Sequence, residues 1–103
     1  MKSHTDLKSE ELDVRRRRLH FRAWHRGMRE VDLLLGRFAD ATITTLDETE
    51  IASFEALLDI PDRQVLAWLI GEDAVPADVD SPLLRRLLSF HGTTLGRPGE
   101  SNE

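Results

Sequence analysis

The stretch HRGMRE, residues 25–30, decides the fold because it places a glycine between two segments whose apolar residues recur at helical spacing. Glycine costs up to about 1 kcal/mol relative to alanine inside a helix, so it suits a junction between helices or a place where another molecule comes close. On a continuous helix, Arg26 and Glu30 would share a face as a weak surface ion pair. The stretch predicts a helix-to-helix corner with Gly27 as a bare spot, and leaves open whether the corner is structural or also binds a partner.

Helical patterns lie on both sides of this corner. The preceding segment, residues 11–24, is rich in arginine, a good helix former, and has a loose apolar side. The following segment, residues 27–38, carries one apolar stripe made of Met28, Val31, Leu35 and Phe38. We therefore expect two helices that join at the corner and bury a common apolar face.

Three more helices are predicted further along the chain. Asp47 and Glu50 have the spacing of a capping box at the start of the third helix, and Pro61 interrupts that helix. Asp62 is the expected cap of a short fourth helix, which stops at Gly71. After an acidic loop over residues 71–80, Ser81 and Pro82 have the cap-and-proline order of a helix start, and a fifth helix follows.

These elements predict an all-α fold, a small five-helix bundle forming a single domain over residues 11–91. The segment 42–45 is short and β-prone, and we expect it to be a loop. Residues 1–10 and 92–103 are polar or rich in Gly and Pro, so we expect them to be disordered N-terminal and C-terminal tails.

The composition bounds the functional classes. The chain has 103 residues and no cysteine, which excludes disulfides, thiolate metal sites and a cysteine nucleophile. No apolar run approaches the roughly 20 residues of a membrane span, and no signal-peptide core is present, so we expect a cytoplasmic protein without membrane insertion. Residues 1–30 hold nine Lys or Arg and five Asp or Glu, a balance of +4, while residues 31–103 have a balance of −9. A basic head on an acidic body favours an oriented protein partner over nucleic acid.

No pattern for catalysis or metal binding is found. GxSxG, HExxH and GxGxxG motifs are all missing, and His20 and His25 are five residues apart without further ligands nearby. We therefore expect no catalytic residues, no metal and no enzyme activity. The arginine run 15–18 could be a phosphate-binding arm or a solvated helix face, and the acidic body favours the solvated face.

The two tryptophans allow different interpretations. Trp68 lies in the apolar pattern of the fourth helix, and we expect it in the core. Trp24 lies at a helix end beside the corner, where core packing and an exposed interface anchor remain equally open.

Residues 26–30, Arg-Gly-Met-Arg-Glu, match the RGxxE motif of the FAD assembly factor SdhE family. Asp32 and Phe38 follow at positions similar to those of the family, and the pair 46–47 resembles its Leu-Ser cap. The segment 57–69 (LLDIPDRQVLAWL) resembles the family's Leu-Leu…Asp…Trp-Leu segment, so the resemblance covers about residues 15–90. The chain departs from the pattern at His25, where bacterial members often have arginine, and at the turn that holds Pro61 and Arg63.

The resemblance implies a five-helix bundle that is an assembly factor or chaperone and not an enzyme. Such proteins bind the flavoprotein subunit of succinate dehydrogenase, or in some bacteria of fumarate reductase, and promote covalent attachment of FAD to a histidine of that subunit. It implies that the chain acts on the FAD of its partner, and we expect a monomer that binds no cofactor stably. It places the partner-binding surface on Arg26, Gly27 and Glu30, with Met28, Arg29, Asp32 and Trp24 beside them.

Variants Gly27→Arg, Arg26→Ala and Glu30→Ala are then expected to impair binding or flavin attachment while the bundle stays folded. An alternative of a different class is an antitoxin-like helical regulatory protein that binds a protein partner. A helix-turn-helix nucleic-acid binder is a third candidate, which the acidic body disfavours.

Overall fold

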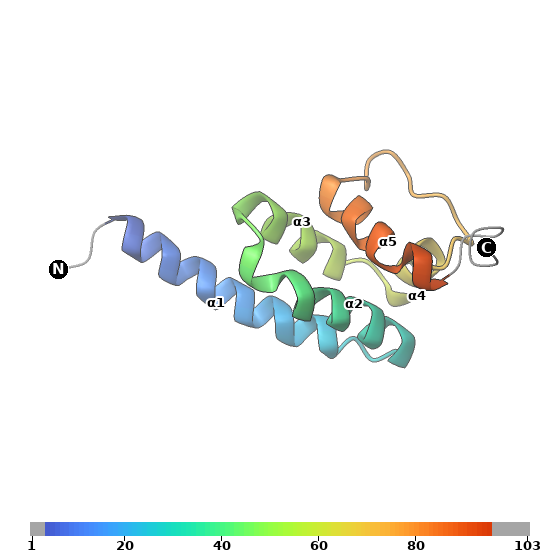
Figure 1. Cartoon of the computed structure of the whole chain (residues 1–103), viewed down its shortest axis with the longest axis horizontal. Helices are drawn as coiled ribbons and strands as arrows, with labels where there is room; N and C mark the ends of the chain where they lie inside the picture. The colour runs from blue at the N-terminus through green and yellow to red at the C-terminus, as the bar shows by residue number, and fades with distance from the viewer. Residues whose placement is uncertain (1–3, 96–103) are drawn as a thin grey trace.

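The computed structural model describes residues 4–95, which form five α-helices and one short 3-10 turn (Figure 1). In chain order these are α1 (His4–Trp24), α2 (Arg29–Thr42), η1 (Ile43–Thr45), α3 (Glu48–Leu58), α4 (Asp62–Leu69) and α5 (Pro82–Leu95). No strand occurs within residues 4–95. The predicted all-α five-helix bundle is confirmed.

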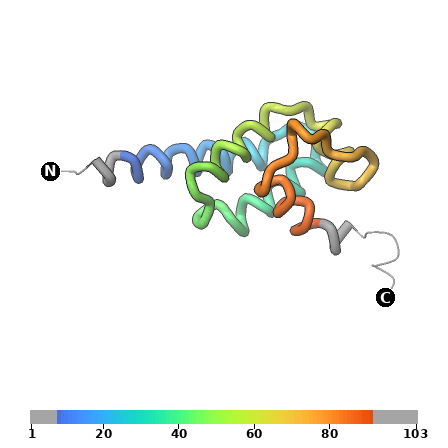
Figure 2. Tube along the Cα trace, turned by 90° about the horizontal axis from the view of Figure 1, so that it is seen from above, coloured from blue at the N-terminus to red at the C-terminus, as the bar shows by residue number. Residues whose placement is uncertain are grey.

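The long helix α1 packs along α2 and α3, and its N-terminal part extends beyond the rest of the bundle (Figures 1 and 2). The helix α2 also packs against α4 and α5, and α3 packs against α5. All five helices therefore contribute side chains to one core. The buried set includes Leu19, Ala23, Val31, Leu35, Phe38, Ile51, Phe54, Val65, Trp68, Leu83, Leu84 and Leu87.

Two helix starts follow from local sequence, as predicted. The Asp47 side chain accepts a hydrogen bond from the Glu50 amide at 2.8 Å, and the Glu50 side chain accepts one from the Asp47 amide at 2.9 Å. These two bonds form the expected capping box. At α5, the Ser81 hydroxyl oxygen accepts a hydrogen bond from the Leu84 amide at 3.0 Å, and Pro82 is the first helical residue.

Several predicted boundaries were wrong. The helix α1 begins at His4, so residues 4–10 are helical and not part of a disordered tail. These residues include good helix formers, and Lys8 pairs with Glu48 of α3 at 3.0 Å, which ties this part of α1 to the bundle. At the other end, α5 continues to Leu95, and the rest of the expected C-terminal tail lies outside the described residues.

The corner and the segment after α2 also differ from the expectation. Met28 is the N-cap of α2 in an extended conformation, so α2 begins at Arg29 and not at Gly27. The helix runs on to Thr42, and the segment predicted as a loop forms the 3-10 turn η1. The additional turn contains Ala39 and Ala41, and alanine is the residue that most favours helix.

The expected cap of α4 was wrong as well. Pro61 occupies the N-cap position and no side chain caps this helix, while Asp62 is its first residue. The Asp62 carboxylate instead binds an arginine from the corner, as described below. Trp68 is buried with 5% of its surface exposed, so the prediction that it belongs to the core is confirmed.

Among the described helices, none has the length and apolar character that a membrane crossing requires.

Candidate functional site

The corner between α1 and α2 is held by a glycine in an unusual backbone conformation. Gly27 has a φ of +100°, a region that residues with a side chain rarely adopt. A Cβ added at this position would meet no other atom within 4 Å, and the residue is exposed. The backbone turn therefore requires the glycine, and the space in front of Gly27 is open.

Arg26 does not lie on the outer surface with Glu30. Its side chain is 12% exposed and points into the junction between α3 and α4. Its Nε donates to Asp62 Oδ1 at 2.8 Å, Nη2 donates to the Ile60 carbonyl at 2.9 Å, and Nη1 donates to the Leu58 carbonyl. Because Leu58 is the last residue of α3, Arg26 satisfies a carbonyl that the helix itself leaves unpaired. The residue thus clamps the corner onto the α3–α4 junction.

Asp32 holds the same corner from the side of α2. Its carboxylate accepts a hydrogen bond from the Arg26 backbone N–H at 2.6 Å, across the glycine turn. Met28 supplies the first backbone acceptor of α2, and its side chain packs against the core. These contacts show that Asp32 and Met28 fix the shape of the turn, whatever else they contact.

The remaining motif residues point outward. Arg29 and Glu30 are exposed, and neither makes a hydrogen bond or ion pair with any residue in the described range. The ion pair that Glu30 and Arg26 would share on a continuous helix is not formed, because the chain turns at Gly27 and Arg26 is bound to Asp62. We call Gly27, Arg29 and Glu30 the corner face: one bare backbone position beside two unpaired charges of opposite sign.

Trp24 supports this corner by packing on α2. Gly36 lies directly under the Trp24 ring, and a Cβ at Gly36 would overlap that ring. The Trp24 Nε1 donates to Asp40 Oδ1 at 3.1 Å, and His20 Nε2 lies 2.6 Å from the same oxygen. The hydrogen bonds from His20 and then Trp24 hold the pKa of the Asp40 carboxyl below its ordinary value. Trp24 is half-buried and fixed in place by these contacts, so it serves the fold.

The supporting residues Gly36, Asp40 and Asp62 were not identified from the sequence as part of this site. A glycine inside the helical pattern of α2 is the one local signal, since it suggests close packing at Gly36. The contacts of Asp40 and Asp62 join residues 16 or more positions apart, and no local spacing indicates them.

The four arginines at positions 15–18 of α1 differ in their contacts: two form hydrogen bonds and two are exposed without any to residues 4–95. Arg15 forms a forked pair with Glu55, with nitrogen-to-oxygen distances of 3.1 and 2.8 Å, and this bond lowers the pKa of Glu55. Arg16 donates to Asp13 and to the Leu46 carbonyl. Arg17 and Arg18 are exposed and have no hydrogen bond or ion pair within the described part of the chain.

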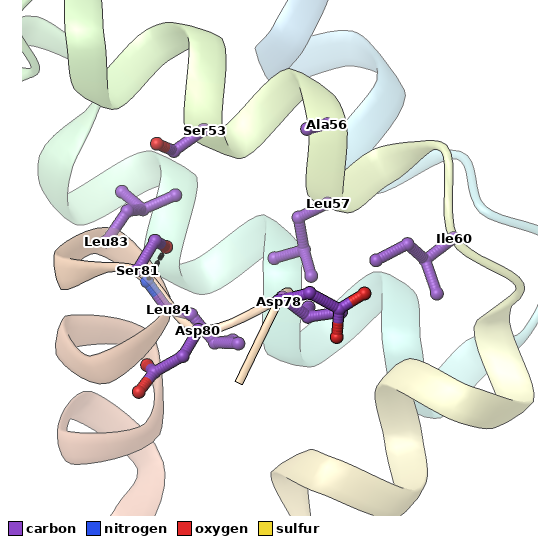
Figure 3. Close-up of a pocket in the computed structure, with 10 residues that line it drawn as sticks. Ser53, Ala56, Leu57, Ile60, Asp78, Asp80, Ser81, Leu83 and Leu84 are labelled. Carbon is purple, nitrogen blue, oxygen red and sulfur yellow. Dashed lines mark hydrogen bonds between the residues drawn. The ribbon is translucent and has the colours of Figure 1, made fainter. Parts of the chain in front are cut away.

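A separate pocket of about 280 Å³ lies between α3, the acidic loop and the start of α5 (Figure 3). Six of its ten lining residues are apolar, with Leu57 and Leu84 among them, and the other four include Asp78 and Asp80. It shares no residue with the corner face. Within the described residues, no three His, Asp or Glu side chains form a group that could hold a metal ion.

The fold and the corner define a class: a small all-α bundle with a polar corner that is held in one conformation. The chain belongs to the family described as flavinator of succinate dehydrogenase, which matches residues 17–91. This range contains the corner, the α3–α4 junction that Arg26 clamps, and the Trp24 support.

Known relatives agree with this membership. The chain is 38% identical over 86 residues to the FAD assembly factor SdhE of Acetobacter pasteurianus, covering 84% of this chain and 79% of the relative. It is 33% identical over 81 residues to the mitochondrial succinate dehydrogenase assembly factor 2 of Dictyostelium discoideum, and 39% identical over 59 residues to that of Debaryomyces hansenii. The matches cover 79% and 57% of this chain, but only 57% and 42% of those two mitochondrial proteins. No solved structure matches the chain.

Proposed function

We propose that this protein binds the flavoprotein subunit of succinate dehydrogenase and promotes the covalent attachment of FAD to it, without being the catalyst itself. Membership of the flavinator family and the names of the relatives, FAD assembly factor and succinate dehydrogenase assembly factor, support the proposal. The proposal extends to the flavoprotein subunit of fumarate reductase as a partner of the same kind. Both the flavin and the histidine that receives it belong to the partner, so this protein acts by binding and orienting that chain.

The observation that carries the proposal is the corner face on its rigid support. The bare backbone at Gly27 allows a partner chain to come close, since no side chain stands in front of it. Arg29 and Glu30 are unpaired, so binding costs no internal ion pair, and complementary charges on the partner would fix its orientation. Because Arg26 and Asp32 already hold the turn, little ordering remains to oppose binding.

In this account the motif has two roles. Arg26, Asp32 and Trp24 are positioning residues that keep the corner in shape. Arg26 binds Asp62, Asp32 accepts from the Arg26 amide, and Trp24 donates to Asp40. Gly27, Arg29 and Glu30 form the contact surface, with Met28 between them.

A binding measurement on the flavoprotein subunit, prepared without FAD, tests the proposal. We expect the double variant Arg29→Gln, Glu30→Gln to bind about tenfold to a hundredfold more weakly than the wild type, since two charges at the centre of the contact are lost. Both residues are exposed and unpaired, so the melting temperature should change little. A Gly27 variant is a poorer probe because any side chain there strains the turn.

The matched control is Arg63→Gln, Glu72→Gln, which removes the same two charges from exposed positions on α4 and the acidic loop. It should bind as the wild type does. If the corner and control variants bind equally well, the corner face is not the contact surface. If the wild-type chain does not bind the flavoprotein at all, the proposed function is wrong.

A further inference from the structure

A groove lies between α1 and the turn η1. It has a volume of about 690 Å³, and its lining includes Arg17, His20, Phe21, Trp24 and Ile43. We call this feature the α1 groove. His25 also lines it and lies two residues before Gly27, so the groove ends where the corner begins.

Phe21 makes this groove unusual for a small bundle. Its side chain is 61% exposed, the most exposed of the large hydrophobic residues in the described range. The ring stacks on His25, with centroids 4.0 Å apart and an interplanar angle of 17°, and the His25 Nδ1 lies 2.7 Å from the Phe21 carbonyl oxygen. The aromatic pair is therefore held in place before any partner arrives. Ordered, exposed aromatic side chains are typical anchors of protein interfaces.

The charge of the groove is positive. Two arginines, Arg16 and Arg17, line it against one carboxylate, Asp13. Asp13 pairs with Arg16 at 3.1 Å, so Arg17 remains as a cation without a hydrogen bond or ion pair in the described part of the chain. Residues 31–103 have a net charge of −9, so Arg17 is an unpaired positive charge on a largely acidic molecule. The complementary ligand is an acidic one with an apolar group.

We propose that the α1 groove is a second docking surface that receives an acidic segment of the flavoprotein partner, with an apolar side chain seated against Phe21 and a carboxylate on Arg17. This inference rests on the proposed function and extends it, because His25, which lines the groove, lies two residues before Gly27 of the corner face. A single partner chain can cover both surfaces. Contact at two adjoining surfaces would fix the orientation of the partner on this small protein.

Binding of the full chain to the FAD-free flavoprotein subunit tests the groove separately from the corner. We expect Phe21→Ser to weaken binding by about tenfold or more, as for an interface anchor, and Arg17→Glu to weaken it by a similar factor. The loss with Arg17→Glu should shrink at high salt, because the interaction is electrostatic. Both side chains are exposed, so circular dichroism and melting temperature should match those of the wild type.

Two controls carry the same chemical changes elsewhere. Ile70→Ser removes an exposed apolar side chain, 42% exposed, after α4, and Arg63→Glu reverses an exposed charge on that helix. Both should bind within about twofold of the wild type.

The outcomes are distinguishable. If Phe21→Ser and Arg17→Glu bind normally while the Arg29, Glu30 double variant does not, the groove inference is overturned and the proposed function stands. If the wild type forms a dimer that Phe21→Ser dissociates, with flavoprotein binding unchanged, the occupant is a second copy of the chain and the inference is again overturned. If the wild type fails to bind the flavoprotein, both proposals are overturned.

Discussion

At the residue scale, neighbours in one short motif have opposite orientations. Arg26 and Glu30 are four positions apart, yet Arg26 is clamped inside the α3–α4 junction and Glu30 faces solvent. The glycine between them makes this possible, because its φ of +100° breaks the helix that would have placed both on one face. The motif therefore contains residues that hold the corner in shape and residues that face solvent.

The contacts of Arg26 change the expectation for its variants. Arg26→Ala removes three hydrogen bonds and leaves the Asp62 carboxylate, 19% exposed, without its cation. We predict a loss of about 2–4 kcal/mol in the free energy of unfolding. Urea unfolding measures it, with Arg29→Ala as the control at an exposed, unpaired arginine, where a change within about 0.5 kcal/mol is expected. Equal effects of the two substitutions would refute the clamp.

Gly36 gives a second residue-scale prediction. A methyl group at this position would overlap the Trp24 ring, so Gly36→Ala should cost about 1–3 kcal/mol through overpacking. In a Trp24→Ala background the overlap is gone, and the same substitution should be neutral or stabilising by up to about 1 kcal/mol, because alanine favours helix. A double-mutant cycle from chemical unfolding gives this coupling. A coupling near zero would mean that Trp24 does not rest on Gly36.

At the scale of elements, the sequence predicted the features that depend on residues close together in the chain. The capping box at Asp47, the start of α5 at Ser81 and the burial of Trp68 all follow from short-range patterns in the chain. The start of α1, the cap of α4 and the partner of Arg26 could not be predicted in that way. Asp62 has the ordinary appearance of a cap, and only the packed structure brings Arg26, 36 positions away, to its carboxylate.

The contact between α2 and α5 carries a pH dependence. His91 is 4% exposed, and its Nε2 lies 2.6 Å from the Leu34 carbonyl oxygen, which fits a neutral ring that donates its hydrogen. Burial lowers the pKa of His91 below its ordinary value, and the nearby Arg37 acts in the same direction, while the bond to Leu34 opposes both. Below about pH 6.5 the unfolded chain gains a proton that the folded chain resists. The free energy of unfolding should therefore fall as the pH decreases from about 6.5 through the lower folded-state pKa.

Urea unfolding at about pH 7.5 and about pH 5 measures this contribution. His91→Gln keeps an N–H donor for the Leu34 carbonyl but does not titrate, so the stability of the variant should fall less on acidification. If the wild type and His91→Gln lose the same stability, the dependence arises elsewhere in the chain.

At the scale of the whole molecule, the bundle separates a structural interior from two outward surfaces. The five-helix fold could be predicted from periodicity and caps, and the corner from its glycine. The division of residues 26–30 into buried and exposed side chains could not be predicted, and neither could the α1 groove. Both depend on how distant helices pack. In our account the hydrogen bonds of Arg26, Asp32 and Trp24 hold the corner face in one conformation, and the corner face recognises the flavoprotein.

The most direct test of this account is the covalent flavin content of the succinate dehydrogenase flavoprotein subunit in cells that lack the gene. Fluorescence of the denatured subunit in a gel reports only flavin that is covalently attached. We predict that the wild-type gene and the Arg63→Gln, Glu72→Gln control restore the fluorescent band, while Arg29→Gln, Glu30→Gln does not, although that variant accumulates as a folded protein. A band restored fully by the Arg29, Glu30 variant would contradict the central claim that the corner face is the working surface.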